Sequence, residues 1–226
     1  MKLSYYGHSC FAVELKGKKV LFDPFISPNE LAKDIDPAQV EADNILISHG
    51  HQDHIADAVD IAKRTQATVI SNFEIITWLQ DKGIENVVPM NLGGLVELDF
   101  GKVKYVNAVH SSMLPDGSYG GNPGGFVVMA DECNFYYAGD TALTLDMQLI
   151  PRYTKLDLAI LPIGDCLTMG IEDAITTCDF IQCNKVMGVH YDTFPNIKID
   201  HNKAVERFRK ADKDLQLVKI GDTVNF

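Results

Sequence analysis

Three histidines and an aspartate crowd into one short stretch of the chain, His49-Gly50-His51-Gln52-Asp53-His54. In an extended segment, residues two apart project to the same side, so the imidazoles of His49 and His51 can ligate one metal ion. Asp53 and His54 then turn toward a second ion. The alternative interpretation, a polar turn that begins a helix, does not require three imidazoles in six residues. The spacing therefore indicates a site for two metal ions.

Two ions need more ligands than this segment holds, and further candidates follow other expected strands. His110 comes directly after a strand-like run, as does His190, and Asp140 follows two residues after another. Each alone could be an ordinary hydrogen-bonded residue at a strand end, but their shared placement would bring them to one rim of the sheets. We expect one ion to be held by His49, His51 and His110 and the other by Asp53, His54 and His190, with Asp140 bridging the two.

Such a centre is suited to hydrolysis. Two divalent cations contribute +4, and Asp53, Asp140 and a bridging hydroxide offset three of these charges, which leaves roughly +1. Bound metals lower the pKa of water from about 15.7 to about 7, so hydroxide exists at neutral pH and can attack a carbonyl or phosphorus centre. Asp140 would hold this nucleophile in line. We expect Asp53, the other carboxylate of the site, to have a catalytic role as well. We expect the substrate to be an ester, lactone or phosphoester of a small anionic metabolite.

The ligand set contains imidazoles and carboxylates without a thiolate. Such a set suits zinc, manganese, iron or nickel and does not select among them. Zinc is the first expectation for the two divalent ions, because it is a common partner of histidine ligands in hydrolytic sites.

Two kinds of hydrophobic pattern alternate along the chain and would position these residues. Short apolar runs bounded by turn residues predict strands, and apolar positions three and four apart predict helices. Ser71 and Glu74 have the spacing of a capping box before a helix that includes residues 75–79. The other elements expected in the first half are strands at 3–6, 11–15, 20–23, 45–47 and 67–70 and a helix over 55–62.

The second half begins as a meander of strands and then returns to alternating strands and helices. The Gly-rich segment 116–125 is interpreted as a long loop, because strands of the same character resume beyond it. The chain is thus predicted to form one domain over 1–226, an α/β (α+β) fold of two β-rich layers with helices on both outer faces. The expected second-half elements are strands at 95–100, 102–109, 125–130, 135–138, 158–163, 185–189 and 215–220 and helices at 171–181 and 203–211.

These motifs, in this order, resemble the metallo-β-lactamase superfamily over essentially the whole chain. The resemblance rests on the HxHxDH segment, the strand-terminal His110, the Ala-Gly-Asp-Thr around Asp140 and the Gly-Val-His-Tyr around His190. It implies an αββα sandwich of two mixed β-sheets, with metals in the cleft between the layers and the ligand assignment given above. More narrowly, the segments 7–11, 161–165, 168–170 and 190–195 resemble the metal-dependent hydrolases related to L-ascorbate-6-phosphate lactonase.

The resemblance draws further residues toward the cleft. It places His8 where its imidazole could hydrogen-bond substrate or carry a proton, although a structural histidine is the alternative. Asp165 fits either a carboxylate that orients a ligand histidine or a turn residue. Cys166 stands where relatives often carry Asn. Tyr119, in the Gly-rich loop, is a candidate for substrate contact, whereas His201, beside a helix cap at Asp200, is expected at the surface.

The cysteines are not expected to act in catalysis. Cys10 and Cys166 lie near proposed site residues, but neither has a base of its own in the sequence, and free cysteine is commonly a small buried hydrophobe. The five cysteines form no CxxC pair, which favours reduced thiols and a cytoplasmic location. We find no signal peptide pattern and no apolar run long enough to span a membrane.

The overall charge narrows the partners. The chain has 31 Asp and Glu against 20 Lys and Arg, a net charge of −11. Such a surface repels nucleic acid and anionic lipid, so we expect a small-molecule substrate and no nucleic acid or membrane partner, in a chain that can form homo-oligomers as relatives do. Three alternatives on the same scaffold stay open: a nucleic-acid phosphodiesterase, an iron-dependent oxidoreductase and a non-catalytic metal-binding protein.

Overall fold

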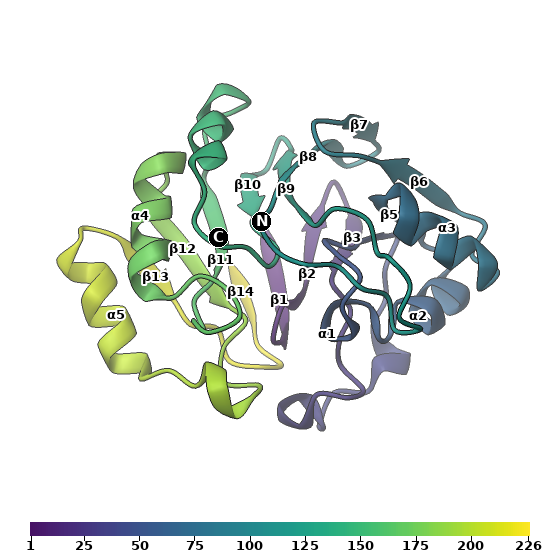
Figure 1. The fold of residues 1–226 in the computed structure, drawn as a ribbon, viewed down its shortest axis with the longest axis horizontal. Coiled ribbons are helices and arrows are strands. Elements are labelled where there is room, and N and C mark those ends of the chain that lie inside the picture. The colour runs from purple at the N-terminus through teal and green to yellow at the C-terminus, as the bar shows by residue number, and fades with distance from the viewer.

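Two seven-stranded mixed sheets form the centre of the structure, a computed structural model that describes residues 1–226 (Figure 1). The first sheet has the order β14-β1-β2-β3-β4-β5-β6, and the second has the order β13-β12-β11-β10-β9-β8-β7. In each sheet four consecutive strands run antiparallel to their neighbours before parallel pairing takes over. The strands of the first sheet are β1 (Lys2–Gly7), β2 (Cys10–Leu15), β3 (Lys18–Phe22), β4 (Asn44–Leu46), β5 (Thr68–Asn72), β6 (Val87–Met90) and β14 (Thr223–Asn225).

Helices cover the outer face of each sheet. In Figure 1 the helices of the first half lie on one side of the paired sheets and those of the second half on the other. The strands of the second sheet are β7 (Leu95–Leu98), β8 (Gly101–Asn107), β9 (Gly124–Met129), β10 (Asn134–Tyr137), β11 (Leu158–Pro162), β12 (Lys185–Val189) and β13 (Asp214–Gln216). The helices are α1 (Gln52–Ile55), α2 (Ala58–Thr65), α3 (Phe73–Asp81), α4 (Ile171–Ile181) and α5 (His201–Lys210), none long and apolar enough to cross a membrane.

Successive side chains along the strands point to opposite faces of each sheet, so the buried apolar residues form three separate cores. On β2, Phe11 and Val13 point into the layer between the sheets, and Ala12 points to the helices on the other side. On β10, Tyr137 faces the inter-sheet layer and Tyr136 the outer one. This period of two, with both faces buried, is what a four-layer arrangement requires. The expected αββα sandwich is confirmed.

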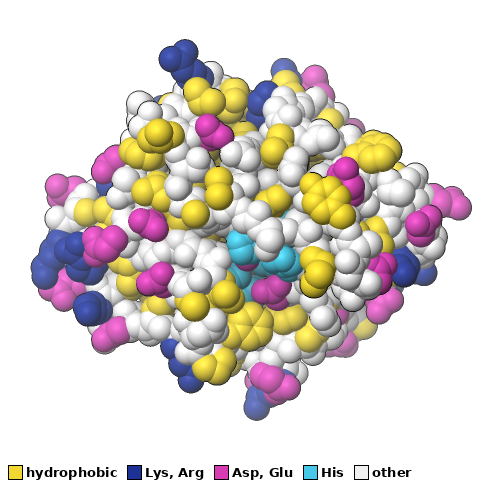
Figure 2. Space-filling model, in the orientation of Figure 1, with side chains coloured by type: hydrophobic (Ala, Val, Ile, Leu, Met, Phe, Trp, Pro, Cys, Tyr) yellow, Lys and Arg dark blue, Asp and Glu magenta, His cyan; other side chains and the backbone are white.

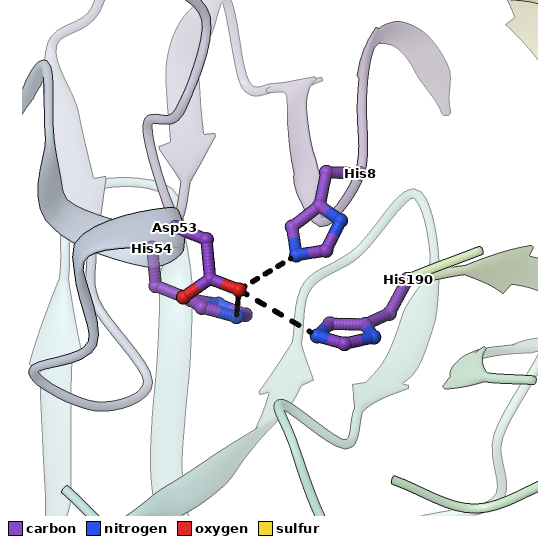
Figure 3. Close-up of side chains that lie close together, drawn as sticks. All are labelled: His8, Asp53, His54 and His190. Atoms are coloured by element: carbon purple, nitrogen blue, oxygen red, sulfur yellow. Dashed lines mark hydrogen bonds and ion pairs between the residues drawn. The ribbon is translucent and has the colours of Figure 1, made fainter. Parts of the chain in front are cut away.

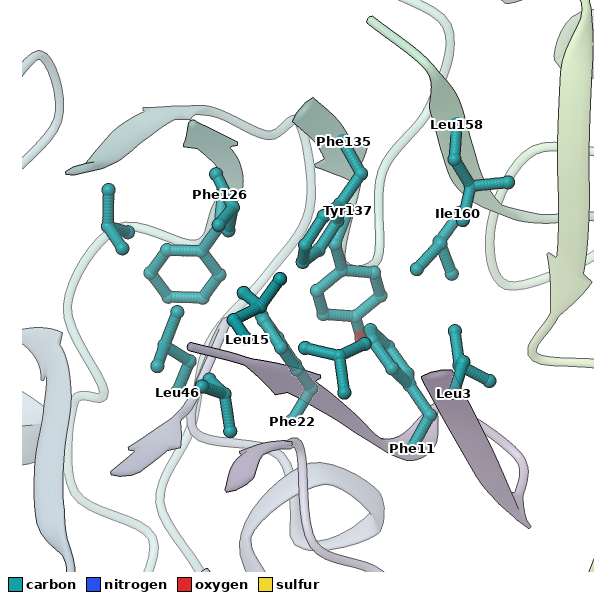
Figure 4. Close-up of a cluster of buried hydrophobic side chains, with 14 of the residues drawn as sticks. Leu3, Phe11, Leu15, Phe22, Leu46, Phe126, Phe135, Tyr137, Leu158 and Ile160 are labelled. Carbon is teal, nitrogen blue, oxygen red and sulfur yellow. The ribbon is translucent and has the colours of Figure 1, made fainter. Parts of the chain in front are cut away.

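Aromatic rings fill the layer between the sheets (Figure 4). The rings of Phe11 and Phe22 stack with centroids 4.6 Å apart, and Tyr137 of the second sheet meets both of them edge-on. Phe126 and Phe135, also from the second sheet, lie edge-on against Phe22. Offset and edge-to-face contacts of this kind stabilise a core beyond the area they bury. Phe22 is therefore a central contact between the two layers.

Several expected elements differ in their ends. The helix expected over 55–62 is two helices, broken near Asp57, because this carboxylate turns back to accept hydrogen bonds from the Ile26 and Ser27 amides. The capping box at Ser71 is wrong. Ser71 lies within β5, and its hydroxyl donates to the Ile47 carbonyl. The side chain of Asn72 caps α3 instead.

The end of the chain also differs. The strand expected over 215–220 covers only Asp214–Gln216, and β14 crosses to the first sheet beside β1, while β6 was not expected at all. Asp200 does cap α5, because its side chain accepts from the Lys203 amide.

We expect Phe22→Ala to lower the free energy of unfolding by about 3–5 kcal/mol, because it empties the space between the two layers. Phe73→Ala is the matched control, since Phe73 is 60% exposed at the start of α3 and should cost no more than about 0.5 kcal/mol. Urea unfolding of both variants measures the difference. Equal losses for the two would show that the inter-sheet aromatic layer is not the main core.

Candidate metal centre

Strand ends bring the expected ligands together. His49 and His51 lie in the turn from β4 to α1, Asp53 and His54 in the first turn of α1, and His110, Asp140 and His190 follow β8, β10 and β12. The structure places all seven at one end of the two sheets, together with His8 from the β1–β2 turn. Figure 2 shows the histidines gathered at the centre of one face. The expectation that strand ends share one rim is met by this geometry.

The side chains form two groups. Ligand atoms of His49, His51 and His110 lie within 4.8 Å of one another, and so do those of His8, Asp53, His54 and His190. Figure 3 shows the second group, with the three imidazoles converging on the Asp53 carboxylate. The first group is the expected first-ion set, and the second is the expected second-ion set with His8 added.

Asp140 lies between the groups. Its Oδ2 is 2.9 Å from Nε2 of His190 and 3.3 Å from Nε2 of His54. The same oxygen is 3.5 Å from Nε2 of His110 and 3.8 Å from Nε2 of His49, in the other group. One carboxylate oxygen therefore faces imidazoles of both groups, which is the position a bridging ligand needs.

Several buried polar atoms around Asp140 lack the hydrogen bonds that such atoms normally make. Nε2 of His54, both ring nitrogens of His190 and Oδ1 of Asp140 are buried and make no hydrogen bond of normal geometry, although Nε2 of His190 lies close to Asp140. Nε2 of His49 faces Nδ1 of His51 at 3.0 Å. Buried polar atoms are nearly always satisfied in proteins, so a group of unpartnered imidazole nitrogens around a carboxylate fits metal ions that would satisfy them.

A buried carboxylate, Asp23, orients two of the imidazoles. Its Oδ2 accepts hydrogen bonds from Nδ1 of His54 at 2.7 Å, from the Ser48 hydroxyl at 2.6 Å and from the Tyr137 hydroxyl. Because the Ser48 hydroxyl donates to Asp23, it accepts from Nδ1–H of His49, 3.0 Å away. Both imidazoles then carry their proton on Nδ1 and keep the Nε2 lone pair for a metal ion.

Asp23 is not among the residues that the sequence motifs predict for the site. The signal was present, because an acidic residue directly after the buried run 20–22 has to find donors inside the protein. Its partners come from the segment after β4, from α1 and from β10, and no pattern in the sequence shows that these segments meet there.

His51 is held differently from its neighbours. Its Nε2 lies 3.3 Å from the Ser111 hydroxyl, and its Nδ1 points to the first group. With Nε2 engaged by Ser111, Nδ1 is the atom available to a metal ion. The segment around His110 thus supports the HxH turn as well as contributing its own imidazole.

His8 is buried and holds Asp53. Its Nε2 is 3.2 Å from Oδ2 of Asp53 and its Nδ1 is 2.9 Å from the Thr193 hydroxyl. An ionised carboxylate only accepts, so Nε2 carries the proton and Nδ1 accepts from Thr193. Its ring also packs 4.1 Å from that of His190. With its side chain fully covered, His8 positions a ligand rather than meeting solvent.

Burial and neighbouring charges set the protonation states. Burial alone would raise the pKa of Asp140, but the adjacent His190 and His54 outweigh it and hold that pKa well below its usual range. Burial lowers the pKa of His49, His51 and His110, which keeps these imidazoles unprotonated and ready to bind a metal. For His54, burial opposes protonation, but Asp140 and Asp23 outweigh it and raise its pKa, so in the metal-free chain Nε2 also carries a proton that has to leave when a metal ion binds.

Access to the centre is narrow. The side chains of Asp53 and His110 are 22% and 16% exposed, whereas Asp140 is 3% exposed and His49 and His54 are fully covered. Figure 2 shows histidine side chains, with acidic side chains beside them, visible at the surface near the middle of this face. A substrate therefore reaches the centre on the side of Asp53 and His110.

The remaining candidates lie outside the centre. Asp165 is exposed and its Oδ1 accepts from the Cys166 amide, so the turn interpretation holds for it. Cys166 is exposed, with the Asn196 amide donating toward its sulfur at 3.5 Å. Cys10 is fully buried, and burial raises its thiol pKa. His201 is at the surface as expected, with Nε2 2.6 Å from Oδ2 of Asp192.

We expect Asp23→Asn to weaken metal binding by about 10–100-fold, because an amide cannot accept all the hydrogen bonds that fix His54 and, through Ser48, His49. Asp57→Asn is the matched control. Asp57 is also a buried carboxylate that accepts from main-chain amides, at Ile26 and Ser27, but it contacts no histidine. Chelator competition followed by elemental analysis separates the two variants, and an equal loss of metal in both would contradict the orienting role of Asp23.

The titration of His8 predicts how the stability of the protein depends on pH. Burial, followed by the charge of nearby His190, lowers the pKa of His8 to about 4. The unfolded chain takes up this proton below about pH 6.5 while the folded chain does not, so stability falls as the pH drops from 6.5 toward 4. In metal-free protein, protonation of His8 on unfolding should lower the free energy of unfolding by about 3 kcal/mol over this pH range.

His8→Asn keeps a donor toward Asp53 but cannot titrate. Urea unfolding of metal-free protein at several pH values should show a shallower decline for this variant than for the unchanged chain. Parallel declines would mean that His8 is protonated in the folded state.

Comparisons with known proteins agree with this geometry. The profile of the family described as "Beta-lactamase superfamily domain" matches residues 2–190. A UPF0173 metal-dependent hydrolase of Christiangramia forsetii is 55% identical over 225 residues, 99% of each chain. Another from Shouchella clausii is 44% identical over 229 residues, again 99% of each chain.

A solved structure extends the agreement to three dimensions. The metallo hydrolase Igni18 of Ignicoccus hospitalis is 35% identical, with a TM-score of 0.88 over 100% of this chain and 97% of that one. The protein belongs to the β-lactamase superfamily, in the group of UPF0173 metal-dependent hydrolases.

Proposed function

We propose that the chain is a hydrolase with two divalent metal ions, acting as one domain over residues 1–226 on an ester, lactone or phosphoester of a small anionic molecule. The observation that carries this proposal is the position of Asp140, whose Oδ2 faces imidazoles of both groups. A structural metal site is closed by its protein ligands, whereas this centre is partly open at Asp53 and His110. The open side favours catalysis over a purely structural role.

When bound, the two ions would supply hydroxide at neutral pH and polarise the oxygen of the group that is cleaved. Asp140 and Asp53 are ionised under these conditions, because nearby imidazoles hold both pKa values below their usual range against the effect of burial. Asp140 therefore accepts a hydrogen bond from the attacking nucleophile and orients it. His8 keeps Asp53 in place by donating Nε2–H to Oδ2.

The side chains at the centre support zinc as the first candidate ion and leave manganese, iron and nickel compatible. Each group offers three or more nitrogen and oxygen atoms and no thiolate.

Charge supports the class of substrate. With Asp53, Asp140, the buried Asp23 and a hydroxide offsetting the two ions, the loaded centre would be about neutral. An anionic group would then be attracted by direct contact with an ion, even in a protein of net charge −11. The same net charge disfavours a nucleic acid as substrate.

We expect Asp140→Ala and His51→Ala to reduce hydrolysis to background while leaving the fold largely intact, because each removes a direct ligand at the end of a sheet. His201→Ala is the matched control, since this imidazole is exposed and lies outside both groups. Turnover on a panel of lactones, carboxylic esters and phosphodiesters, elemental analysis and circular dichroism should be measured together. A metal-depleted variant that keeps full turnover would refute the proposal.

A further inference from the structure

The segments that surround the metal centre contain no lysine or arginine. Seven segments supply or support the site residues, and together they make up roughly a third of the chain, yet none of its 20 Lys and Arg falls in them. In Figure 2 the Lys and Arg side chains lie toward the edge of this face, away from the histidines. The seven segments are 7–11, 23–29, 47–57, 105–123, 138–151, 161–173 and 190–197.

Exposed apolar side chains, rather than Lys or Arg, lie around the metal centre. Met113 and Tyr119 are 57% and 63% exposed and face each other across a β-bridge, and Val109 and Leu167 are 49% and 45% exposed. We call these four residues the apolar rim. Figure 2 shows hydrophobic side chains around the histidines on this face. Exposed large hydrophobic residues gathered at one site mark a binding surface more often than scattered ones do.

Hydrogen bonds fix the apolar rim beside the centre. The Ser112 hydroxyl accepts from the Gly50 amide at 3.0 Å, and Ser111 contacts His51, so the loop that bears Met113 and Tyr119 is attached to the HxH turn. On the opposite side, the Met169 amide donates to the carbonyl of Thr141, next to Asp140, at 2.9 Å. This bond holds the loop that bears Leu167.

We propose that the substrate has an uncharged, apolar body, which packs against the apolar rim, and at most one negative charge, located on the group that the metals bind. This inference rests on the proposed function and specifies its substrate class. The two ions would be offset by Asp53, Asp140, the buried Asp23 and a hydroxide, so the loaded centre would hold no surplus positive charge for a second anionic group. A second negative charge, such as that of a phosphorylated side group, would meet no Lys or Arg in the seven segments. Three cations outside these segments, Lys198, Lys203 and Arg207, line a cavity beside Asp165 and Cys166, and Arg207 is paired there with Glu172.

Hydroxamates with different tails test this inference by binding, because the hydroxamate group chelates the metal while the tail varies. Acetohydroxamate, hexanohydroxamate and succinic monohydroxamate should be titrated calorimetrically into the metal-loaded full chain. A fully buried methylene improves affinity about fourfold, so the hexanoyl tail should bind at least about tenfold more tightly than the acetyl one even if only half buried. The succinic tail, which ends in a carboxylate, should bind no more tightly than acetohydroxamate.

Variants locate the effect. The double variant Met113→Ser and Tyr119→Ser should lose most of the advantage of the hexanoyl tail. Leu95→Ser is the matched control, because Leu95 is also exposed, at 53%, but lies in β7 outside the seven segments. A tail advantage that survives the double variant, or that Leu95→Ser removes equally, would overturn the role of the apolar rim.

A kinetic comparison separates failure of the inference from failure of the proposed function. The 4-nitrophenyl ester of hexanoate and the mono-4-nitrophenyl ester of adipate share a leaving group and chain length, but only adipate carries a distal carboxylate. We expect kcat/KM to favour the hexanoate ester by about tenfold or more. A preference for adipate, or for the succinic hydroxamate, would overturn the inference and leave a metal-dependent hydrolase. The proposed function itself would be overturned if the loaded protein bound no acetohydroxamate and hydrolysed no substrate on the panel.

Discussion

The buried carboxylate of Asp23 is the interaction on which the centre depends. It accepts hydrogen bonds from a ligand imidazole, from Ser48 beside another ligand and from Tyr137 of the opposite sheet. A buried charge is costly unless several donors satisfy it, and here the donors come from segments far apart in sequence. The same contact therefore joins the two sheets and sets which nitrogen of His54 and His49 is free for a metal ion.

The main features of the site could be predicted because they follow from periodicity. Strands of the two sheets end at a common rim, so His190, directly after β12, and His110, shortly after β8, come together there. Asp23 and the break near Asp57 could not be predicted, because both are decided by partners that are distant in sequence. The same holds for β14, whose pairing with β1 closes the chain on itself.

Charge is distributed so that an acidic protein can still attract an anion. The net charge of −11 comes from the whole surface, but the field at the centre is set by ions and carboxylates within a few ångströms. Because Lys and Arg are absent from the segments that supply the site residues, the metals would be the positive charges closest to a bound substrate. Selectivity would then come from shape and apolar contact around one charge-binding point, rather than from several charged anchors.

Backbone strain at the site links metal binding to stability. His8, Asp23 and His190 each adopt a positive φ, between 42° and 55°, directly after a strand. This left-handed conformation turns the chain sharply, and it costs a residue other than glycine roughly 1–2 kcal/mol. Three such residues therefore cost about 3–6 kcal/mol, a large part of the 5–15 kcal/mol by which a domain is typically stable. The contacts of Asp23 offset part of this cost in the metal-free chain. The ring nitrogens of His190 make no hydrogen bond of normal geometry there, and its Nε2 would gain a metal partner when an ion binds. Metal binding should thus complete the fold at this rim as well as equip it for chemistry.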